Sequence, residues 1–234
     1  GDVYKRQSYN GTTRTYKYTV RYSAVSEIGT FILNSQADVD ALADHHVTVI
    51  EGSLSIATVE NTEDPVINLN GLAKITEVMD DITIGQYYKG ENLAGLAKLE
   101  KAGSISMRNN SSLTEFALPN LLSIRGELFI ANPAENNITS IKCPQLTTIL
   151  KQCYIQAPNL KSLNLNSLES IPGKGDNSDG DGTFSLYGSQ LVSLDLPVLK
   201  QVGKKFTLSL GTKHPELTQI NLPELISCKE AVSY

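Results

Sequence analysis

One leucine-rich pattern repeats along this chain of 234 residues from Val49 onward. Its clearest copy, from Leu191 to Leu208, reads L-x-x-L-x-L-P-x-L-x-x-V-G-x-x-F-x-L. A repeat of about 20 to 50 residues is typical of solenoids, in which each coil buries its apolar residues by stacking on its neighbours. One slot of the pattern recurs every 22 to 31 residues, at Val78, Ala102, Ile124, Ile149, Ile171, Val202 and Cys228. With a less complete copy from Ile50 to Ile56, the pattern predicts eight coils.

Alternation within each coil predicts strands. The L-x-L pairs place apolar side chains at every second position, as in a strand with one buried face, and helical spacing is absent. Stacked coils would bring equivalent strands together at about 4.8 Å in two parallel ladders, with the L-x-x-I link turning a corner between them. Proline follows the strand of the first ladder in four coils, at Pro119, Pro144, Pro197 and Pro223. The expected fold is therefore mainly β, a right-handed parallel β solenoid of leucine-rich coils with a short N-terminal helical cap.

The chain is expected to divide into three segments. Residues 1–14 are interpreted as a leader of vector or adaptor origin, because Asp2 to Gln7 matches the translation of a common sequencing-adaptor end. Residues 15–46 are expected to form an N-terminal strand and a capping helix. Residues 47–234 form the solenoid of eight coils.

Two sequence patterns in residues 15–46 predict the strand and the helix. Tyr16 and Tyr18 alternate with polar residues, which is typical of a half-buried strand. Ser35, with Asp38 three residues later, forms a capping box that marks the start of a short helix. We expect this helix to cover the open end of the stack, where strand edges and apolar side chains are otherwise exposed.

The stretch FILNSQADVDALADHHVTVIEGSLSIA, from Phe31 to Ala57, resembles the opening of bacterial receptor L-domain-like leucine-rich repeat surface proteins, in which a helix leads into T-x-I-x-G-x-L-x-I. The coils that follow resemble these proteins up to residue 234. The resemblance implies a secreted or cell-surface-anchored bacterial protein that binds partners without catalysis. The cysteine-rich modules that accompany receptor L domains are absent, so receptor signalling is not implied.

Charge and hydropathy narrow the range of partners. The chain has 20 basic and 25 acidic residues, a net charge of -5, and no long cluster of Lys and Arg, so nucleic acid is not an expected partner. No apolar run reaches the roughly 18 to 20 residues that span a bilayer, so we expect no transmembrane segment. We expect a monomer, extracellular or anchored at a cell surface in the bacterial outer envelope, that binds a protein or a glycan.

Catalytic motifs are missing from the sequence. None of the three histidines, His45, His46 and His214, lies in a recognisable nucleophile motif, and no glycine-rich phosphate loop follows a strand. A glycosidase or lyase on a parallel β-helix remains an alternative, but it requires carboxylates on neighbouring coils. The outward row of the second ladder has none: Ser55, Thr83, Ser106, Phe129, Tyr154, Ser185, Thr207 and Ser233. The first ladder offers one acid among Ala117, Lys142, Asn164, Asp195 and Asn221. We therefore do not expect an enzyme; a passive spacer in the cell envelope is a further alternative.

The three cysteines replace apolar residues at inward slots of the coils. Cys143 aligns with Leu118, Cys153 with Leu128, and Cys228 with Val202. We expect three buried, reduced thiols that behave as small hydrophobic side chains. Cys143 and Cys228 lie three coils apart, about 14 Å, which excludes a disulfide between them, and no zinc-ligand spacing occurs.

The longest coil contains an acidic loop, from Pro172 to Thr183. Asn177, Asp179 and Asp181 match N-x-D-x-D-G, the first half of a calcium loop, and Asp176 precedes them. The twelfth position holds Gly188 in place of the bidentate glutamate. Weak calcium binding, millimolar at best, is therefore the alternative to a plain flexible loop, and no other cofactor is expected.

Aromatic side chains interrupt the outward row of the second ladder, which is otherwise Ser and Thr and suits a solvated face. Phe129 and Tyr154 fall in successive coils, and Tyr187 lies two residues beyond the next row position. Exposed aromatics anchor protein partners and stack on sugar rings, so these three residues form the candidate ligand-binding site. The absence of Trp favours a protein over a glycan. The alternative is that the loop at 172–183 folds over the aromatic side chains and buries them.

Overall fold

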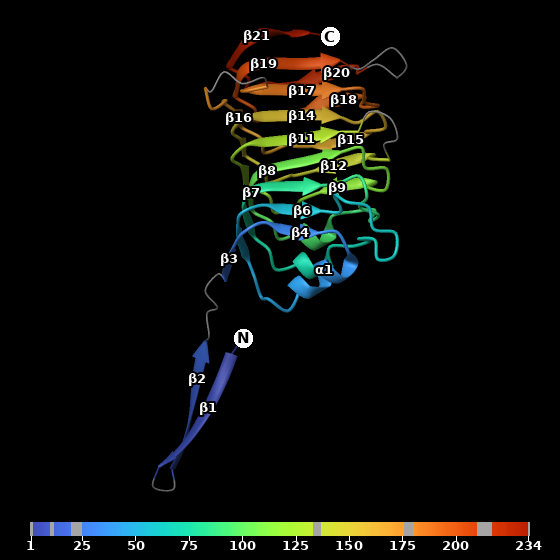
Figure 1. Ribbon diagram of the computed structural model, residues 1–234. Helices are drawn as coiled ribbons and strands as arrows, with labels where there is room; N and C mark the ends of the chain where they lie inside the picture. The colour runs from blue at the N-terminus through green and yellow to red at the C-terminus, as the bar shows by residue number, and fades with distance from the viewer. Residues whose placement is uncertain are drawn as a thin grey trace.

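The structure is a computed structural model. It describes the backbone of residues 2–9, 12–19, 25–132, 137–175, 180–209 and 217–233, and the side chains of 25–132, 137–175, 180–209 and 217–230. The described chain is a parallel β solenoid of about 8 turns with one short helix near the N-terminus, which confirms the predicted fold class (Figure 1). No described helix is long and apolar enough to span a membrane.

Three ladders run along the stack, although the leucine spacing predicts two. The first ladder consists of two separate sheets: one contains β9 (Glu115–Ala117), β12 (Ser140–Lys142) and β15 (Ser162–Asn164), and the other contains β18 (Ser193–Asp195) and β20 (Gln219–Asn221). The second ladder contains β4 (Phe31–Leu33), β6 (Leu54–Ile56), β11 (Glu127–Ala131), β14 (Gln152–Gln156) and β17 (Thr183–Tyr187). Between them, a corner ladder contains β3 (Ser26–Ile28), β5 (Val49–Glu51), β10 (Ser123–Ile124), β13 (Thr148–Ile149) and β16 (Ser170–Ile171).

The corner ladder arises because the last two residues of the L-x-x-I link form strands. Four long strands pass from the corner ladder into the second ladder without a break: β7 (Glu77–Ile84), β8 (Lys101–Arg108), β19 (Gln201–Ser209) and β21 (Ser227–Ser233). The pairing shifts register where β7 and β19 bend, between Val78 and Asp81 and between Val202 and Lys205. The last two residues of the link thus pair with those of neighbouring coils, which adds a third ladder to the two that the leucine spacing predicts.

The predicted register of the coils is confirmed. In the second ladder, Phe129 lies beside Tyr154, Tyr154 beside Ser185 and Ser185 beside Thr207. In the first ladder, Lys142 lies between Ala117 and Asn164, and Asp195 beside Asn221. Leucine spacing suffices for this register because a slip by one residue would turn every inward side chain outward.

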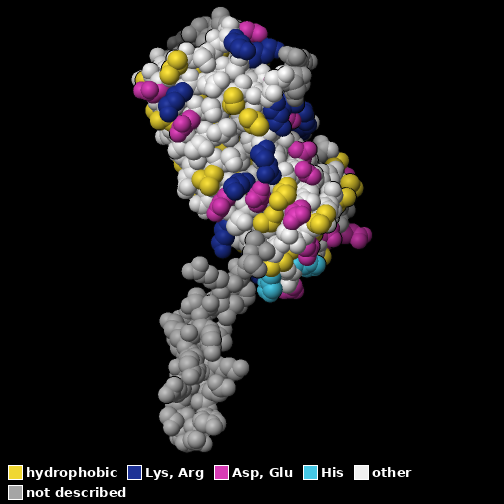
Figure 2. Space-filling view, turned by 90° about the vertical axis from the view of Figure 1, so that its left-hand side faces the viewer, with side chains coloured by type: hydrophobic (Ala, Val, Ile, Leu, Met, Phe, Trp, Pro, Cys, Tyr) yellow, Lys and Arg dark blue, Asp and Glu magenta, His cyan; other side chains and the backbone are white. Residues whose placement is uncertain are grey.

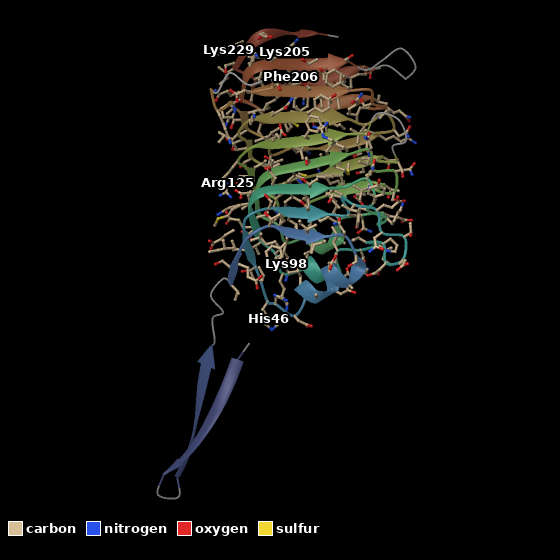
Figure 3. The ribbon with its side chains drawn as sticks, viewed as in Figure 1. His46, Lys98, Arg125, Lys205, Phe206 and Lys229 are labelled. Carbon is tan, nitrogen blue, oxygen red and sulfur yellow. The ribbon has the colours of Figure 1, made fainter. Side chains whose placement is uncertain are left out.

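A continuous apolar core fills the stack. The inward residues of successive coils are almost entirely buried, and Phe184 stacks on Phe206 with their ring centroids 4.7 Å apart. Figure 3 labels Phe206 in the C-terminal part of the stack. Tyr88 is also buried: its hydroxyl donates to the carbonyl of Asn92 at 2.6 Å, and burial raises its pKa above the ordinary range. Tyr88 therefore belongs to the core and not to an exposed aromatic patch.

Glycines at the bends allow successive coils to approach closely. A methyl group added to Gly103, in β8, would overlap the carbonyl oxygen of Asp80 in the coil below, and one added to Gly203 would overlap the carbonyl of Pro172. Gly52 stands in the same relation to Gly29. At these three bends the glycine is thus required by packing of backbone on backbone.

The capping box and its helix are confirmed. Helix α1 (Gln36–Leu42) begins after Ser35, whose hydroxyl accepts a hydrogen bond from the Asp38 amide while the Asp38 carboxylate accepts one from the Ser35 amide. The helix buries Val39 and Leu42. It packs at the N-terminal end of the stack on the 3-10 turn η1 (Asn70–Leu72), which packs in turn on η2 (Ala94–Leu96) (Figure 1).

The residues around α1 form a further level of the stack, ahead of the first predicted coil. Strand β3 pairs with β5, and β4 pairs with β6. The helix follows β4 and therefore connects this additional level to β5, in the first predicted coil.

An antiparallel hairpin precedes the stack. Strand β1 (Asp2–Tyr9) pairs with β2 (Thr12–Thr19), so the strand predicted around Tyr16 exists but begins earlier. Most of the segment interpreted as a leader thus takes part in a strand pair. Its origin remains a prediction.

One polar side chain is built into the core. The Asn110 amide nitrogen donates to the carbonyls of Gly85 (3.0 Å) and Tyr88 (2.8 Å), and its oxygen accepts from the amides of Ser112 (3.1 Å) and Leu113 (2.9 Å). Its own backbone amide donates to the side chain of Asn132 in the next coil. Asn110 therefore satisfies backbone groups where the chain leaves the second ladder.

Candidate functional site

The aromatic side chains predicted as a ligand site lie together on the outer face of the second ladder. Strands β11, β14 and β17 carry Phe129, Tyr154 and Tyr187, one from each of three successive coils. The Phe129 and Tyr154 rings are stacked, with centroids 4.6 Å apart and planes 8° from parallel. The Tyr187 ring lies 5.2 Å from Tyr154, tilted by 35°.

A fourth side chain extends this stack toward the N-terminal coils. Arg108, in β8, places its guanidinium carbon 4.0 Å from the centre of the Phe129 ring, within the distance of a cation–π contact. We call Arg108, Phe129, Tyr154 and Tyr187 the aromatic row. The sequence interpretation missed Arg108, although it lies two positions beyond Ser106 and so points outward by the same alternation.

The stacking determines which parts of the rings face a partner. Phe129 has Arg108 over one face and Tyr154 over the other, and Tyr154 lies between Phe129 and Tyr187. All four side chains are at least partly exposed. The row therefore presents ring edges and hydroxyl groups outward, while the ring faces of Phe129 and Tyr154 cover one another.

Tyr154 is held in place by its neighbours. Its hydroxyl lies 3.2 Å from Oε1 of Gln156, to which it donates. Burial and the neighbouring Tyr187 raise the pKa of Tyr154, and Arg108 lowers it in part. The hydroxyl is thus neutral at physiological pH and acts as a hydrogen-bonding group.

The rest of the outward row is less solvated than the sequence predicts. Ser55, Thr83 and Ser106 are partly exposed, as expected. Ser185 and Thr207, in the C-terminal coils, are buried. The prediction of a uniformly solvated face is therefore wrong for these coils, and the accessible part of the row lies at the aromatic residues and on their N-terminal side.

The described part of the acidic loop does not cover the aromatic row. Gly180 lies against the side chain of Gln152, and the amide of Gly182 donates to the carbonyl of Lys151 at 2.7 Å. These contacts place the end of the loop at the beginning of β14. Phe129 and Tyr154 remain partly exposed, so the alternative in which the loop buries them is not supported by the described residues.

The predicted calcium ligands are only partly visible. Asp176, Asn177 and Asp179 lie outside the described residues. Asp181 is buried, and its two carboxylate oxygens accept hydrogen bonds from the amides of Lys174 (2.6 Å) and Gly175 (2.8 Å). Within the described ranges no group of three or more His, Cys, Asp or Glu side chains could hold a metal ion. Asp181 thus closes the loop on itself, and weak calcium binding stays a prediction.

A shallow groove of about 220 Å³ lies next to the N-terminal end of the aromatic row. Thr83 and Ser106 line it from the outward row, with Gly85, Arg108 and Asn109 beside them. Arg108 is the one charged side chain among the described residues that line the groove. The groove and the aromatic row form one continuous surface, since Arg108 belongs to both.

A second groove, of about 460 Å³, lies at the bend between the corner ladder and the second ladder. Asp80, Asp81, Arg125 and Lys174 line it, so its charges are mixed. Arg125 donates to the Glu77 carboxylate at 3.2 Å and to the Met79 carbonyl at 2.8 Å. Figure 3 labels Arg125 at this edge of the stack, and Figure 2, which views that side, shows side chains of both charges scattered over it.

A row of outward residues that precedes the aromatic one was not considered in the sequence interpretation. It places Asp81 and Glu127 in coils on either side of Ser104. Two ladder steps separate them, about 10 Å along the stack. Asp81 is exposed and Glu127 is partly exposed, so neither carboxylate lies in a buried apolar pocket of the kind that holds a general acid.

The histidines are surface residues where they are described. His45 and His46 are exposed in the turn after α1, and His45 lies 3.2 Å from the Glu27 carboxylate. Figure 3 labels His46 at the N-terminal end of the stack. His214 lies outside the described residues.

The cysteines follow the prediction at two positions out of three. Cys143 and Cys153 are fully buried free thiols; burial raises the pKa of the Cys143 thiol to about 12 and that of Cys153 further. Cys228 is only partly buried, so the prediction of a shielded thiol is wrong there. Its slot is inward as predicted, but in the described chain a coil packs on one side of it alone, the coil of Val202.

Thiol labelling should separate these positions. We expect one thiol per native chain, Cys228, to react with an uncharged maleimide within minutes at pH 7.5. Cys143 and Cys153 should react only after denaturation, because thiolate formation and reagent access both require exposure. Mass spectrometry of tryptic peptides would assign each label. Fast native labelling of Cys153 would contradict the inward register of β14. Fast native labelling of Cys143 would contradict the inward position of the residue that follows β12.

Comparisons with known proteins returned no match: no family model, no curated protein and no solved structure resembles the chain closely enough to be counted. The resemblance to bacterial receptor L-domain-like proteins therefore stays a prediction from the sequence.

Proposed function

We propose that this chain is a non-catalytic binding module that presents the outer face of its second ladder to a protein partner through the aromatic row. The observation that carries the proposal is the ordered stack of Arg108, Phe129, Tyr154 and Tyr187, held at spacings of 4.0 to 5.2 Å and at least partly exposed. Rigid, partly exposed aromatic side chains lose little conformational entropy on binding and are typical anchors of protein interfaces.

The orientation of the rings favours a protein over a glycan. A sugar ring packs against the open face of an aromatic ring, but Phe129 and the adjacent Tyr154 have their faces covered by each other and by their neighbours. Ring edges carry partial positive charge and therefore contact carbonyl oxygens favourably, and they also pack against aliphatic groups. A polypeptide supplies both. Glycan recognition is the alternative that the binding experiment below also examines.

The cellular setting is part of the proposal. We propose an extracellular or cell-surface location and a monomeric chain, on the basis of the sequence resemblance from Phe31 to Ala57. An enzyme of the glycosidase or lyase class would require a pair of carboxylates on nearby coils; Asp81 and Glu127, two ladder steps apart on the second ladder, are such a pair, and the exposure of their side chains gives that alternative little support. A passive spacer would not require an exposed aromatic row.

Replacement of Phe129 and Tyr154 together by serine tests the proposal. Binding to arrays of extracellular proteins and of glycans would be compared between the parent and the F129S/Y154S variant. We expect the parent to bind a protein and the variant to lose about 30-fold or more in affinity, the effect of removing a central pair of anchors. Circular dichroism should show the same strand content in both.

A matched control removes two apolar side chains that are more exposed but lie off the second ladder. Ile67 and Val192 are 56% and 59% exposed, and their joint replacement by serine should leave binding unchanged. Equal binding by the parent and F129S/Y154S would overturn the aromatic row as the site. Binding to glycans alone, lost in F129S/Y154S, would replace the protein partner by a sugar.

A further inference from the structure

The groove at the N-terminal end of the aromatic row is lined by uncharged residues and Arg108, which favours binding of an anion. We infer that Arg108 and the groove beside it form a carboxylate subsite, which receives an acidic side chain of the partner while an apolar side chain of the same segment packs on the ring edges of Phe129 and Tyr154. This inference rests on the proposed function, because it specifies the partner of that surface.

Arg108 differs from Arg125, the other arginine whose side chain is described, because it has no ion pair with a described carboxylate. Arg125 pairs with Glu77, Lys142 with Glu115, and Lys200 with Glu169. Arg108 instead contacts the Phe129 ring and lowers the pKa of Tyr154 in part, and no carboxylate among the described residues pairs with it. An exposed arginine without a counterion keeps its guanidinium donors available to a ligand.

The guanidinium of Arg108 is also held in a defined position. Its stacking on Phe129 at 4.0 Å restrains a side chain that would otherwise sample many rotamers. Guanidinium groups bind carboxylates through two parallel N–H···O bonds, and a restrained guanidinium loses less entropy when those bonds form. The aromatic row therefore both supplies the apolar contact and positions the cation.

The ladder leaves room for a ligand on both sides of Arg108. In the next coil the residue beside it is Ala131, and in the preceding coil Gly85 follows the last paired residue, Ile84. Neither neighbour has a side chain larger than a methyl group. A carboxylate can therefore approach the guanidinium without displacing another side chain.

The groove walls add uncharged hydrogen-bonding groups. The hydroxyls of Thr83 and Ser106 lie 3.4 Å apart at its floor, a weak contact that leaves both able to bond to a ligand. Asn109 is exposed beside Arg108, with a φ of 53° that asparagine tolerates better than most residues. With no acid among the described lining residues, the local charge is positive although the chain carries a net charge of -5. The groove thus complements an anion.

The spacing of the row fits an extended peptide. The Arg108 guanidinium carbon lies 4.0 Å from the centroid of the Phe129 ring, which lies 4.6 Å from that of the Tyr154 ring, so the guanidinium and the second ring are less than about 9 Å apart. In an extended chain, residues i and i+2 point the same way about 7 Å apart. An acidic residue and an apolar residue two positions away would therefore reach Arg108 and the ring edges together.

Two blocked tripeptides probe the subsite directly. N-acetyl-Glu-Ala-Leu-amide and its Gln-Ala-Leu counterpart would be titrated to about 20 mM into the nitrogen-15-labelled full chain, with amide shifts followed by NMR. We expect the glutamate probe to shift the amides of Ser106, Arg108 and Phe129 with a millimolar Kd, and to bind at least fivefold more tightly than the glutamine probe. Glucuronate, titrated in parallel, examines a sugar acid as the source of the carboxylate.

Two variants identify the cation responsible. Arg108→Gln should abolish the difference between the two tripeptides, whereas Lys142→Gln, which removes one positive charge on the first ladder, should preserve it. Equal affinities of both tripeptides at the aromatic row would overturn the carboxylate subsite and leave the proposed function standing. Shifts with glucuronate but not with the tripeptides would overturn the peptide partner, and no shift at the row with any probe would count against both the subsite and the aromatic row as a binding surface.

Discussion

Replacing Gly103 by alanine is expected to lower the free energy of unfolding by about 3 kcal/mol or more. The added methyl group would overlap the carbonyl oxygen of Asp80 and lie 2.6 Å from its carbonyl carbon. Cβ atoms in proteins essentially never come closer than 3.0 Å to a heavy atom of this kind. Backbone atoms in paired coils cannot move aside without breaking ladder hydrogen bonds, so the strain is not relieved locally. Equilibrium unfolding in urea would measure the loss.

Gly126, at the bend of the following coil, provides the matched control. A methyl group there would overlap the hydroxyl oxygen of the Ser104 side chain, while the nearest backbone atom, the Gly103 carbonyl oxygen, would be 3.0 Å away. A side chain can rotate where a backbone carbonyl cannot, so Gly126→Ala should cost about 1 kcal/mol, and less in a Ser104→Ala background. Equal costs for Gly103→Ala and Gly126→Ala would show that the coils are not in close backbone contact at this bend.

Much of the fold could be predicted because a solenoid repeats one simple rule. Alternate residues of a strand face inward, and equivalent strands of successive coils lie side by side, so the leucine spacing alone places Phe129 beside Tyr154. The same rule identifies the inward slots of Cys143 and Cys153. It fails for the depth of burial of Cys228, because burial depends on coils on both sides and not on the slot itself.

The site could be predicted only in part, for a different reason. Alternation shows which side chains point outward but not which of them touch, so the stacking of Phe129 and Tyr154 and the position of Tyr187 are findings of the structure. Arg108 was within reach of the sequence, two residues beyond Ser106 in the same strand. That no carboxylate among the described residues pairs with Arg108 could not be predicted, because this depends on residues from other coils.

Removal of the Asn110 side chain is expected to lower the free energy of unfolding about as much as Gly103→Ala does. The leucine pattern does not predict this effect. Asn110→Ala would remove two donors from the carbonyls of Gly85 and Tyr88 and one acceptor from the amides of Ser112 and Leu113. The bonds to Tyr88 and Leu113 are buried, where each unpaired backbone group costs about 1 to 3 kcal/mol. We expect a loss of about 3 to 5 kcal/mol in the free energy of unfolding, measured in urea.

Asn120→Ala is the control that shows whether the loss of stability comes from the buried hydrogen bonds of Asn110 or from replacing any asparagine. Asn120 is exposed; its side chain donates to the Ala97 carbonyl at 2.8 Å and accepts a long, exposed hydrogen bond from the Gln145 side chain at 3.4 Å, so Asn120→Ala should cost less than about 1 kcal/mol. Hydrogen exchange adds a local readout, since the amides of Ser112 and Leu113 should lose protection in Asn110→Ala before the amides of β8 and β11 do. If both alanine variants unfold at the same urea concentration, water replaces the Asn110 side chain at little cost, and its four hydrogen bonds do not hold the chain where it leaves the second ladder.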